Sequence, residues 1–153
     1  MVIDMGKTVL ASGVFDLLHY GHVRFLEEAK RLGGPDARLV VIVARDKTVE
    51  RLKGRRPIIP EDQRRALVEA LKVVDEALLG YEEMNLEAVL EHVKPDIIAV
   101  GYDQEGIERE VRRIIAERGL DIEVVRIGRF GDEELSSSSK IKRKIVEDWM
   151  RRL

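Results

Sequence analysis

The sequence predicts a doubly wound α/β domain, in which helices cover both faces of a parallel sheet. Short apolar runs alternate along the chain with amphipathic stretches of helical period. The clearest run, Leu39–Ala44, is β-branched and apolar on both faces, as a buried parallel strand requires. With 153 residues and no repeat, linker or composition break, the chain is expected to form one domain over residues 1–153.

The expected elements alternate between strand and helix from one end to the other. The strands are expected at Thr8–Ala11, Leu39–Ala44, Glu76–Leu79, Asp96–Val100 and Ile122–Ile127. The helices are expected at His22–Leu32, from Pro60 onward, at Leu86–Val93, around Ile107–Ile115 and at Ser138–Arg151. The inward stripe of the helix after Pro60 is expected to be Ala66, Leu67, Ala70, Leu71 and Val74. Five strands in this order predict a Rossmann-like fold, whose ligands bind outside the carboxyl ends of the strands.

Composition excludes several classes of function. The 27 basic and 29 acidic residues leave a net charge of −2, so no overall basic field attracts nucleic acid or an anionic membrane. The absence of cysteine excludes disulfides, thiolate nucleophiles and thiolate metal sites. The longest apolar run is far below the ~20 residues that cross a bilayer, and the first residues lack the apolar core of a signal peptide. We therefore expect a cytoplasmic protein with no nucleic-acid or membrane partner.

The segment Gly13–His22, GVFDLLHYGH, lies between the first strand and the first helix. A glycine at such a turn lets the backbone approach a phosphate, and the start of a helix offers free N–H groups to an anion. His19 and His22 flank Gly21, so both imidazoles could donate to phosphate oxygens as charge develops. The alternative is a capped turn with surface histidines. Because two of only three histidines lie where ligands should bind, we favour the functional interpretation, and too few ligands remain for a zinc site.

The pattern Gly-x-Phe-Asp-x-x-His-x-Gly-His resembles the signature of the cytidylyltransferase-like nucleotidyltransferases, the HxGH superfamily. The order of elements is similar to that family over nearly the whole chain. The resemblance implies a fold of the HUP type and transfer of a nucleotidyl group to a phosphate, with release of pyrophosphate and no covalent intermediate. It also implies a divalent cation, Mg²⁺ first with Mn²⁺ or Co²⁺ as alternatives, and a homodimer.

A basic loop follows the second strand and its short extension. Lys53 and Arg55 flank Gly54, which permits the loop to move over a triphosphate. The resemblance gives phosphate contacts to both cations; the alternative is a solvated basic loop. Arg64 matches a family arginine at the start of the next helix, for which a structural role is the alternative.

Two further segments lie where the family binds its nucleotide. Asp103 follows the fourth strand and could accept from a ribose hydroxyl or a base amino group, although Gly-Tyr-Asp is also ordinary turn chemistry. Ser137, Ser138 and Ser139 precede a basic helix and form an anion cradle. Simple N-capping would need only one of these serines.

The middle of the chain resembles a narrower family, the archaeal FAD synthases, over Val43–Val49, Lys53–Pro60 and Lys94–Ile98. Those enzymes adenylylate FMN with ATP to give FAD and pyrophosphate, so the resemblance implies ATP and FMN as substrates. It implies His19, His22 and Lys53 as catalytic residues. It implies nucleotide contacts from Gly13, Val14, Phe15, His19, Gly21, His22, Arg55, Asp103, Phe130, Ser137, Ser138 and Ser139.

Two alternatives remain open from the sequence. One is a cytidylyltransferase that acts on glycerol 3-phosphate or another small phosphorylated alcohol. Such enzymes carry Arg-Thr-Glu-Gly where this chain has Asp132–Leu135, and the acidic replacement argues against glycerol phosphate with CTP. The other is a nucleotide-binding regulator without turnover. For the flavin, Tyr20, Tyr81 and Trp149 are available aromatics, with Trp149 expected to pack on the last helix.

Overall fold

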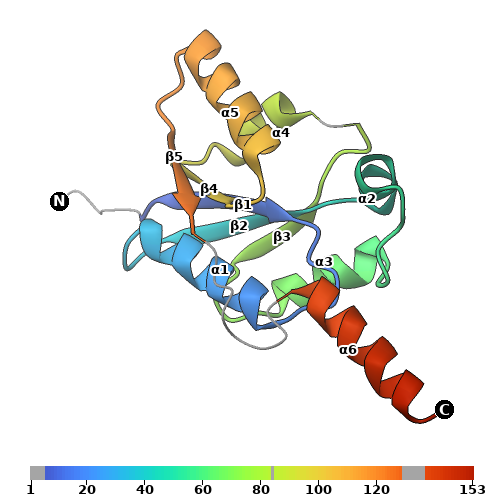
Figure 1. Ribbon diagram of the computed structural model, residues 1–153. Helices are drawn as coiled ribbons and strands as arrows, with labels where there is room; N and C mark the ends of the chain where they lie inside the picture. The colour runs from blue at the N-terminus through green and yellow to red at the C-terminus, as the bar shows by residue number, and fades with distance from the viewer. Residues whose placement is uncertain (1–5, 84, 129–136) are drawn as a thin grey trace.

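The computed structural model describes residues 6–83, 85–128 and 137–153 (Figure 1). The strands are β1 Thr8–Gly13, β2 Arg38–Val43, β3 Glu76–Leu79, β4 Ile97–Gly101 and β5 Glu123–Ile127. The helices are α1 Tyr20–Leu32, α2 Asp46–Lys53, α3 Glu61–Glu69, α4 Leu86–Val93, α5 Glu105–Arg118 and α6 Ser138–Arg151. The alternation confirms the predicted α/β fold. No helix in these ranges is both long enough and apolar enough to cross a membrane.

All five strands run parallel, in the order β3-β2-β1-β4-β5. The chain builds outward from β1 through β2 to β3 and then returns to β4 on the other side of β1. In such sheets ligands bind at the carboxyl edge where the strand order reverses. Here that point lies between β1 and β4, directly above the Gly13–His22 segment (Figure 1).

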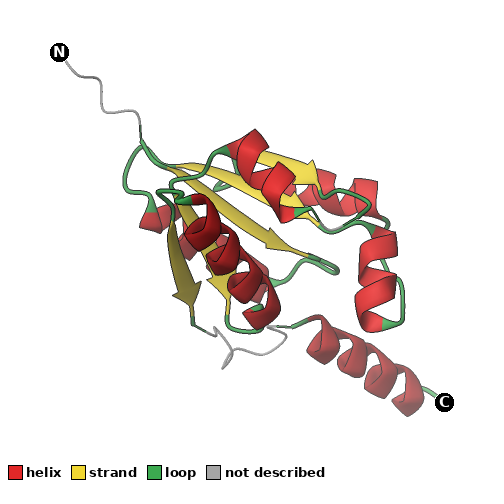
Figure 2. Cartoon of the chain, turned by 90° about the horizontal axis from the view of Figure 1, so that it is seen from above, coloured by secondary structure: helices red, strands yellow, loops and turns green. Residues whose placement is uncertain are grey.

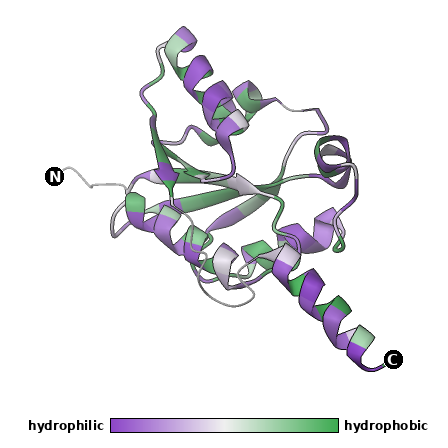
Figure 3. Cartoon of the chain, viewed as in Figure 1, coloured by the Kyte–Doolittle hydropathy of each residue, from purple (hydrophilic) through white to green (hydrophobic). Residues whose placement is uncertain are grey.

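Two apolar layers sandwich the sheet, because successive residues of a strand point to opposite faces. Val9 of β1 joins a cluster with Leu26 of α1 and Val68 of α3, whereas the next residue, Leu10, joins a cluster with Leu90 of α4. Figure 2 shows the twisted strands between these helices, and Figure 3 shows the hydrophobic residues concentrated along the strands. The double coverage explains why the strands read as continuous apolar runs.

Helix α2 was not predicted from the sequence. Its eight residues, DKTVERLK, include one buried side chain, Val49, so the apolar period is too weak to mark a helix. It ends at Gly54, whose φ of 75° is the left-handed conformation that glycine adopts at helix ends. Lys53 is therefore the last residue of a helix rather than part of a free loop.

The predicted inward stripe of the helix after Pro60 is wrong for three of its five residues; the other two, Leu71 and Val74, follow the end of α3 and belong to the core or pack against it. Ala66, Leu67 and Ala70 are exposed, with Leu67 44% exposed, and the buried residues are Arg64 and Val68. The face of α3 that points toward the sheet therefore carries an arginine, and it differs from the apolar face that the sequence predicted. A hydropathy pattern does not predict this arrangement, because arginine is strongly polar. Arg64 can be buried only because other groups pair with its charge and its N–H donors.

Helix α6 extends away from the body of the domain (Figures 1 and 2). None of its residues is buried, and Ile145, Val146, Trp149 and Met150 are each at least half exposed. The expectation that Trp149 packs within the domain is wrong, since 63% of it is exposed.

Arg64 is fully buried and binds three backbone carbonyls and one carboxylate at the carboxyl edge of the sheet. Its Nη1 donates to the carbonyl oxygens of Val14 and Ala44, both at 2.7 Å. Its Nε donates to Ile59 at 2.8 Å, and its Nη2 pairs with the Asp46 carboxylate at 2.7 Å. This supports the structural role that the sequence analysis left open for Arg64.

Replacing Arg64 with methionine should lower the free energy of unfolding by about 3–5 kcal/mol, because the largely buried Asp46 carboxylate loses its counterion and three carbonyls lose their donor. Urea denaturation measures the change. Arg113, whose described ion pairs on α5 are exposed, gives the control: Arg113→Met should lower the free energy of unfolding far less than Arg64→Met. Equal losses in the two variants would contradict the role assigned to Arg64.

Candidate active site

The turn between β1 and α1 has an unusual backbone. Phe15 and Leu17 both have positive φ, 55° and 50°, a conformation that side chains other than glycine rarely adopt. The Phe15 ring packs so closely over Gly13 that a Cβ there would lie 2.9 Å from it. Gly13 therefore makes room for Phe15. Strain of this kind persists where the surroundings enforce it and is concentrated at functional sites.

His19 and His22 lie stacked at the start of α1, with ring centroids 3.7 Å apart. The backbone N–H of His19 donates to Nδ1 of His22 at 3.3 Å. Because Nδ1 accepts, the proton of the neutral ring is on Nε2, which makes His22 a hydrogen-bond donor without a charge. The structure thus brings together the two histidines that the sequence paired.

The pKa of His22 is lowered to about 3, first by burial and then by the adjacent His19, while Asp16 opposes the shift. Burial also lowers the pKa of His19. A proton on Nδ1 of His22 would face the N–H of His19, so the hydrogen-bond geometry also lowers the pKa of His22. At neutral pH the pair is uncharged, and an arriving polyphosphate would favour its protonation.

Two buried side-chain atoms have no hydrogen-bond partner among the described residues, Nδ1 of His19 and Oγ1 of Thr48. An unsatisfied buried polar atom is costly, and such atoms in native proteins often belong to functional sites. One of the two, Nδ1 of His19, belongs to the histidine pair.

Asp16 is a connector that the sequence analysis did not identify. It is buried, and its two carboxylate oxygens accept from the backbone N–H groups of Ile58 and Ile59 at 2.8 and 2.9 Å. These bonds tie the histidine turn to the chain that follows the basic loop. The signal in the sequence was a single charged residue, Asp16, inside the otherwise apolar GVFDLL segment.

The basic loop projects its cations outward. Lys53 and Arg55 are exposed on either side of Gly54, and the side chain of neither forms an ion pair or a hydrogen bond with another described residue. Arg56, by contrast, pairs with Glu50 at 2.8 Å. The two cations that the sequence analysis assigned to phosphate are therefore the two that remain available.

A tight turn follows β4. Asp103 is exposed in this turn, and the next residue, Gln104, accepts from the N–H of Gly101 at 2.8 Å and donates to the carbonyl of Ser12 at 2.9 Å. Gln104 thus joins the ends of β1 and β4 where the strand order reverses. Gln104 was not predicted as a site residue, because nothing in the local sequence of the turn indicates a contact with a residue 92 positions away.

The serine run begins α6. Ser137 is the N-cap, and its Oγ accepts from the N–H of Lys140 at 3.2 Å. Ser138 and Ser139 form the first turn, where hydroxyls and unpaired N–H groups face the end of the helix. Capping therefore accounts for Ser137 and leaves the other two without that role. Phe130 and the Asp132–Leu135 segment lie outside the described residues.

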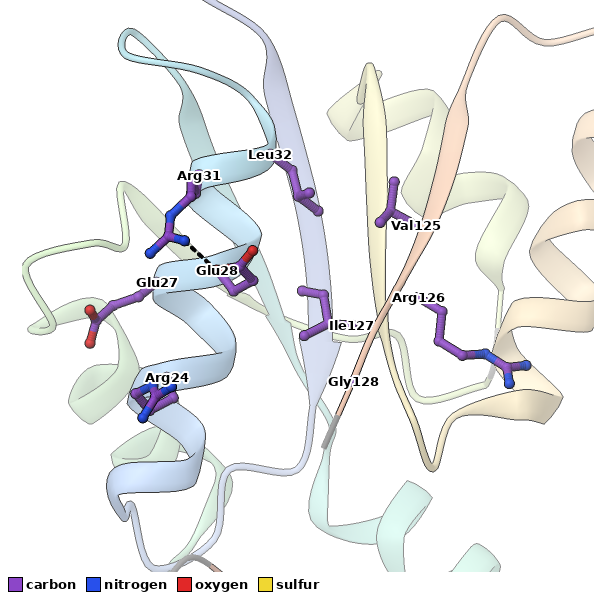
Figure 4. A pocket seen from close by; sticks show the side chains of 9 residues that line it. All are labelled: Arg24, Glu27, Glu28, Arg31, Leu32, Val125, Arg126, Ile127 and Gly128. Atoms are coloured by element: carbon purple, nitrogen blue, oxygen red, sulfur yellow. Dashed lines mark ion pairs between the residues drawn. The ribbon is translucent and has the colours of Figure 1, made fainter. Parts of the chain in front are cut away.

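A cavity between α1 and β5 is separate from these residues. It measures about 440 Å³, with Leu32, Val125 and Ile127 among its lining (Figure 4). The charged side chains of Arg24, Glu27, Glu28 and Arg31 border it on the α1 side. None of the predicted site residues lines it.

Comparison with known proteins identifies the family of the chain. The model of the cytidylyltransferase-like family matches residues 10–144, and the chain belongs to that family. The chain is 50% identical over 147 residues to the FAD synthase of Methanopyrus kandleri, covering 96% of this chain and 97% of the relative. It is 54% identical over 140 residues to the FAD synthase of Ferroglobus placidus, covering 92% and 88%.

Solved structures have the same fold. A lipopolysaccharide core biosynthesis protein from Thermoplasma volcanium superimposes with a TM-score of 0.73 at 46% identity, over 82% of this chain and 98% of that one. A protein of unknown function from Archaeoglobus fulgidus superimposes with a TM-score of 0.66 at 19% identity, over 82% and 93%, and shares the fold alone.

The depressed pKa of His22 predicts a pH-dependent stability. In the unfolded chain His22 binds a proton near its ordinary pKa of 6.5, whereas in the folded protein it does so only near 3. The free energy of unfolding should therefore fall as the pH is lowered, with about 2 kcal/mol lost through this group between pH 7 and pH 5. Urea denaturation at both pH values measures the loss. His22→Gln should show a correspondingly smaller loss, and an identical loss would contradict the assignment.

Proposed function

We propose that this chain is an ATP-dependent FMN adenylyltransferase, an FAD synthase. The observation that carries the proposal is the identity of 50–54% with FAD synthases over nearly the whole of both chains, together with the intact GVFDLLHYGH segment. A phosphate oxygen of FMN attacks the α-phosphorus of ATP. The bond from that phosphorus to the β-phosphate oxygen breaks, and pyrophosphate leaves with the electron pair.

The histidine pair is proposed to stabilise the transferring phosphate. His22 presents an Nε2–H donor whose tautomer is already fixed by the N–H of His19. Donors aimed at developing charge accelerate a reaction most when they need no rearrangement. His19, stacked on His22, is assigned to the same phosphate through its own ring, and the free N–H groups at the start of α1, with Gly21, add to the anion site.

The remaining proposed contacts surround that anion site. Lys53 and Arg55 neutralise the leaving pyrophosphate, and Ser137, Ser138 and Ser139 bind triphosphate oxygens at the start of α6. Asp103 accepts from the adenosine, and Phe130 contacts it from the segment after β5. Gly13, Val14 and Phe15 are assigned to the nucleotide through the backbone of their turn, because the Phe15 ring is buried.

The divalent cation is proposed to arrive bound to the triphosphate. In the described parts of the chain, no three His, Asp or Glu side chains are placed to hold a metal ion, and Asp16 already accepts two N–H groups. A site with so few protein ligands suits Mg²⁺, which keeps several of its waters and binds substrate phosphates. Mn²⁺ and Co²⁺ are the alternatives. Such an ion would neutralise charge on the polyphosphate, while the protein's own cations hold the nucleotide in line.

The reaction is assigned to the cytoplasm, where both nucleotides are available, and to a homodimer. The homodimer is supported by α6 and the residues that follow it, where Ile141, Ile145, Trp149 and Leu153 recur every four residues, symmetrically about Glu147. A two-fold interface needs a surface that complements itself. Two antiparallel α6 helices would place Ile145 of each against Trp149 of the other.

The proposed function is tested by pyrophosphate release from ATP or CTP, each with FMN or glycerol 3-phosphate. FAD formed in step with pyrophosphate from ATP and FMN alone supports the proposal, and release only from CTP and glycerol 3-phosphate replaces it with the cytidylyltransferase. In the same assay, His22→Ala should lower kcat at least a hundredfold, equivalent to about 3–4 kcal/mol.

Two conservative replacements of His22 separate its two nitrogens. Glutamine reproduces the outward Nε2 donor, whereas asparagine reproduces only the position of Nδ1 that caps His19. His22→Gln should therefore retain more turnover than His22→Asn, with thermal melting used to confirm that both fold. The reverse order would contradict the role of Nε2.

Sedimentation equilibrium tests the homodimer. The wild-type chain should sediment as a dimer, and Trp149→Glu should convert it to a monomer by placing a charge in the apolar interface. Leu67→Glu introduces the same charge at an exposed leucine of α3, and it should leave the dimer intact. A monomeric wild-type chain would overturn the assignment.

A further inference from the structure

A second cavity, of about 190 Å³, opens beside the carboxyl end of β3. Its walls are apolar, with Ile42 from β2, Leu78 and Leu79 from β3, and Val89 and Val93 from α4. Arg45, Gly80, Tyr81 and His92 complete the lining. None of the residues assigned above to ATP belongs to it, so the proposed reaction leaves its use unexplained.

Backbone hydrogen bonds connect this cavity to the histidine turn. The N–H of Gly80 donates to the carbonyl of Val43 at 2.9 Å, and the N–H of Ala44 donates to the carbonyl of Gly13 at 2.9 Å. The ends of β1, β2 and β3 are thus held side by side. Within the sheet, two strand spacings separate β3 from β1, which is about 9–10 Å.

The two halves of the carboxyl edge differ in the groups they offer. On the β4–β5 side lies Asp103, which the proposed function uses for the nucleotide. On the β2–β3 side the structure describes an apolar hollow and a half-exposed aromatic ring, Tyr81, at 47% exposure. A reaction that joins two nucleotides in line at the histidine pair needs one site on each side of it.

We propose that the isoalloxazine ring of FMN binds in this cavity beside Tyr81, an inference that rests on the proposed function. The dimethylbenzenoid end of the ring is flat and apolar and matches the walls formed by Ile42, Leu78 and Val89. The five-carbon ribityl chain then spans the two strands back to the histidine pair, where the FMN phosphate reacts. A volume below the ~300 Å³ of a complete ligand pocket suits one end of the ring, with the rest lying over the strand ends.

Arg45 supplies the polar contact at the mouth of the cavity. Its Nε donates to the carbonyl of Gly80 at 2.6 Å and its Nη1 pairs with Glu61 at 3.1 Å, so the guanidinium is fixed in place. These bonds use two of its five N–H donors. The remaining donors can bind a carbonyl oxygen on the pyrimidine edge of the flavin, which orients the ring with its apolar end inward.

Two substitutions test the cavity from opposite sides. Tyr81→Ala removes the stacking ring, and Gly80→Leu fills the space, since Gly80 does not have a positive φ and its Cβ would meet no atom closer than 3.4 Å. Each should raise the Kd for FMN and for riboflavin about tenfold, measured by flavin fluorescence. The KM for ATP should stay within about twofold of wild type, because ATP binds on the other half of the edge.

Tyr102 provides the matched control. It follows Gly101 at the end of β4 as Tyr81 follows Gly80 at the end of β3, and its exposure of 49% is nearly the same. Tyr102→Ala should leave the Kd for both flavins unchanged. Riboflavin, which lacks the phosphate, confirms that any effect concerns the ring.

The outcomes separate this inference from the function on which it rests. If the wild-type enzyme makes FAD but Tyr81→Ala and Gly80→Leu bind both flavins normally, the flavin site lies elsewhere and the proposed function stands. If the folded wild-type chain neither binds FMN nor forms FAD, both proposals fall. Weakened flavin binding in the two cavity variants, with normal binding in Tyr102→Ala, supports the site.

Discussion

The arrangement of the carboxyl edge depends on one buried cation, Arg64. A charge without solvent is stable only when its donors are fully engaged, and this guanidinium meets three carbonyls and the Asp46 carboxylate. The turn before the histidines, the end of β2 and the start of α2 are all among its partners. Lys53 is the last residue of α2. Arg64 therefore holds the basic loop and the histidine turn in fixed positions relative to each other, because it binds Asp46 at the start of α2 and Val14 in the turn.

The histidine pair is held ready by contacts that do not involve substrate. Asp16 fixes the turn to Ile58 and Ile59, and the His19 N–H fixes the tautomer of His22. Burial keeps both rings neutral at the pH of the cell. An uncharged donor in a strained but well-supported turn suits a reaction whose negative charge is brought by the substrates and redistributed during transfer.

The topology divides the edge into two substrate halves. Because the strand order reverses beside β1, the histidine pair lies between the ends of β2–β3 and the ends of β4–β5. In the proposed reaction FMN approaches from the first half and ATP from the second. Helix α6 adds the serine run at its start and an exposed apolar stripe along its length, so nucleotide binding and association of two chains would share one element.

The sequence by itself determined the order of strands and helices and the segment that carries the histidines. The apolar periodicity and the glycines that end helices are local signals, so they can be identified without knowledge of the tertiary contacts. Only the tertiary structure decided the inward face of α3, the existence of α2 and the exposure of Trp149, because each depends on what packs against the element. The same holds for Asp16, Arg64 and Gln104: their partners lie far away in the chain, and a buried polar residue is recognised only once those partners are in place.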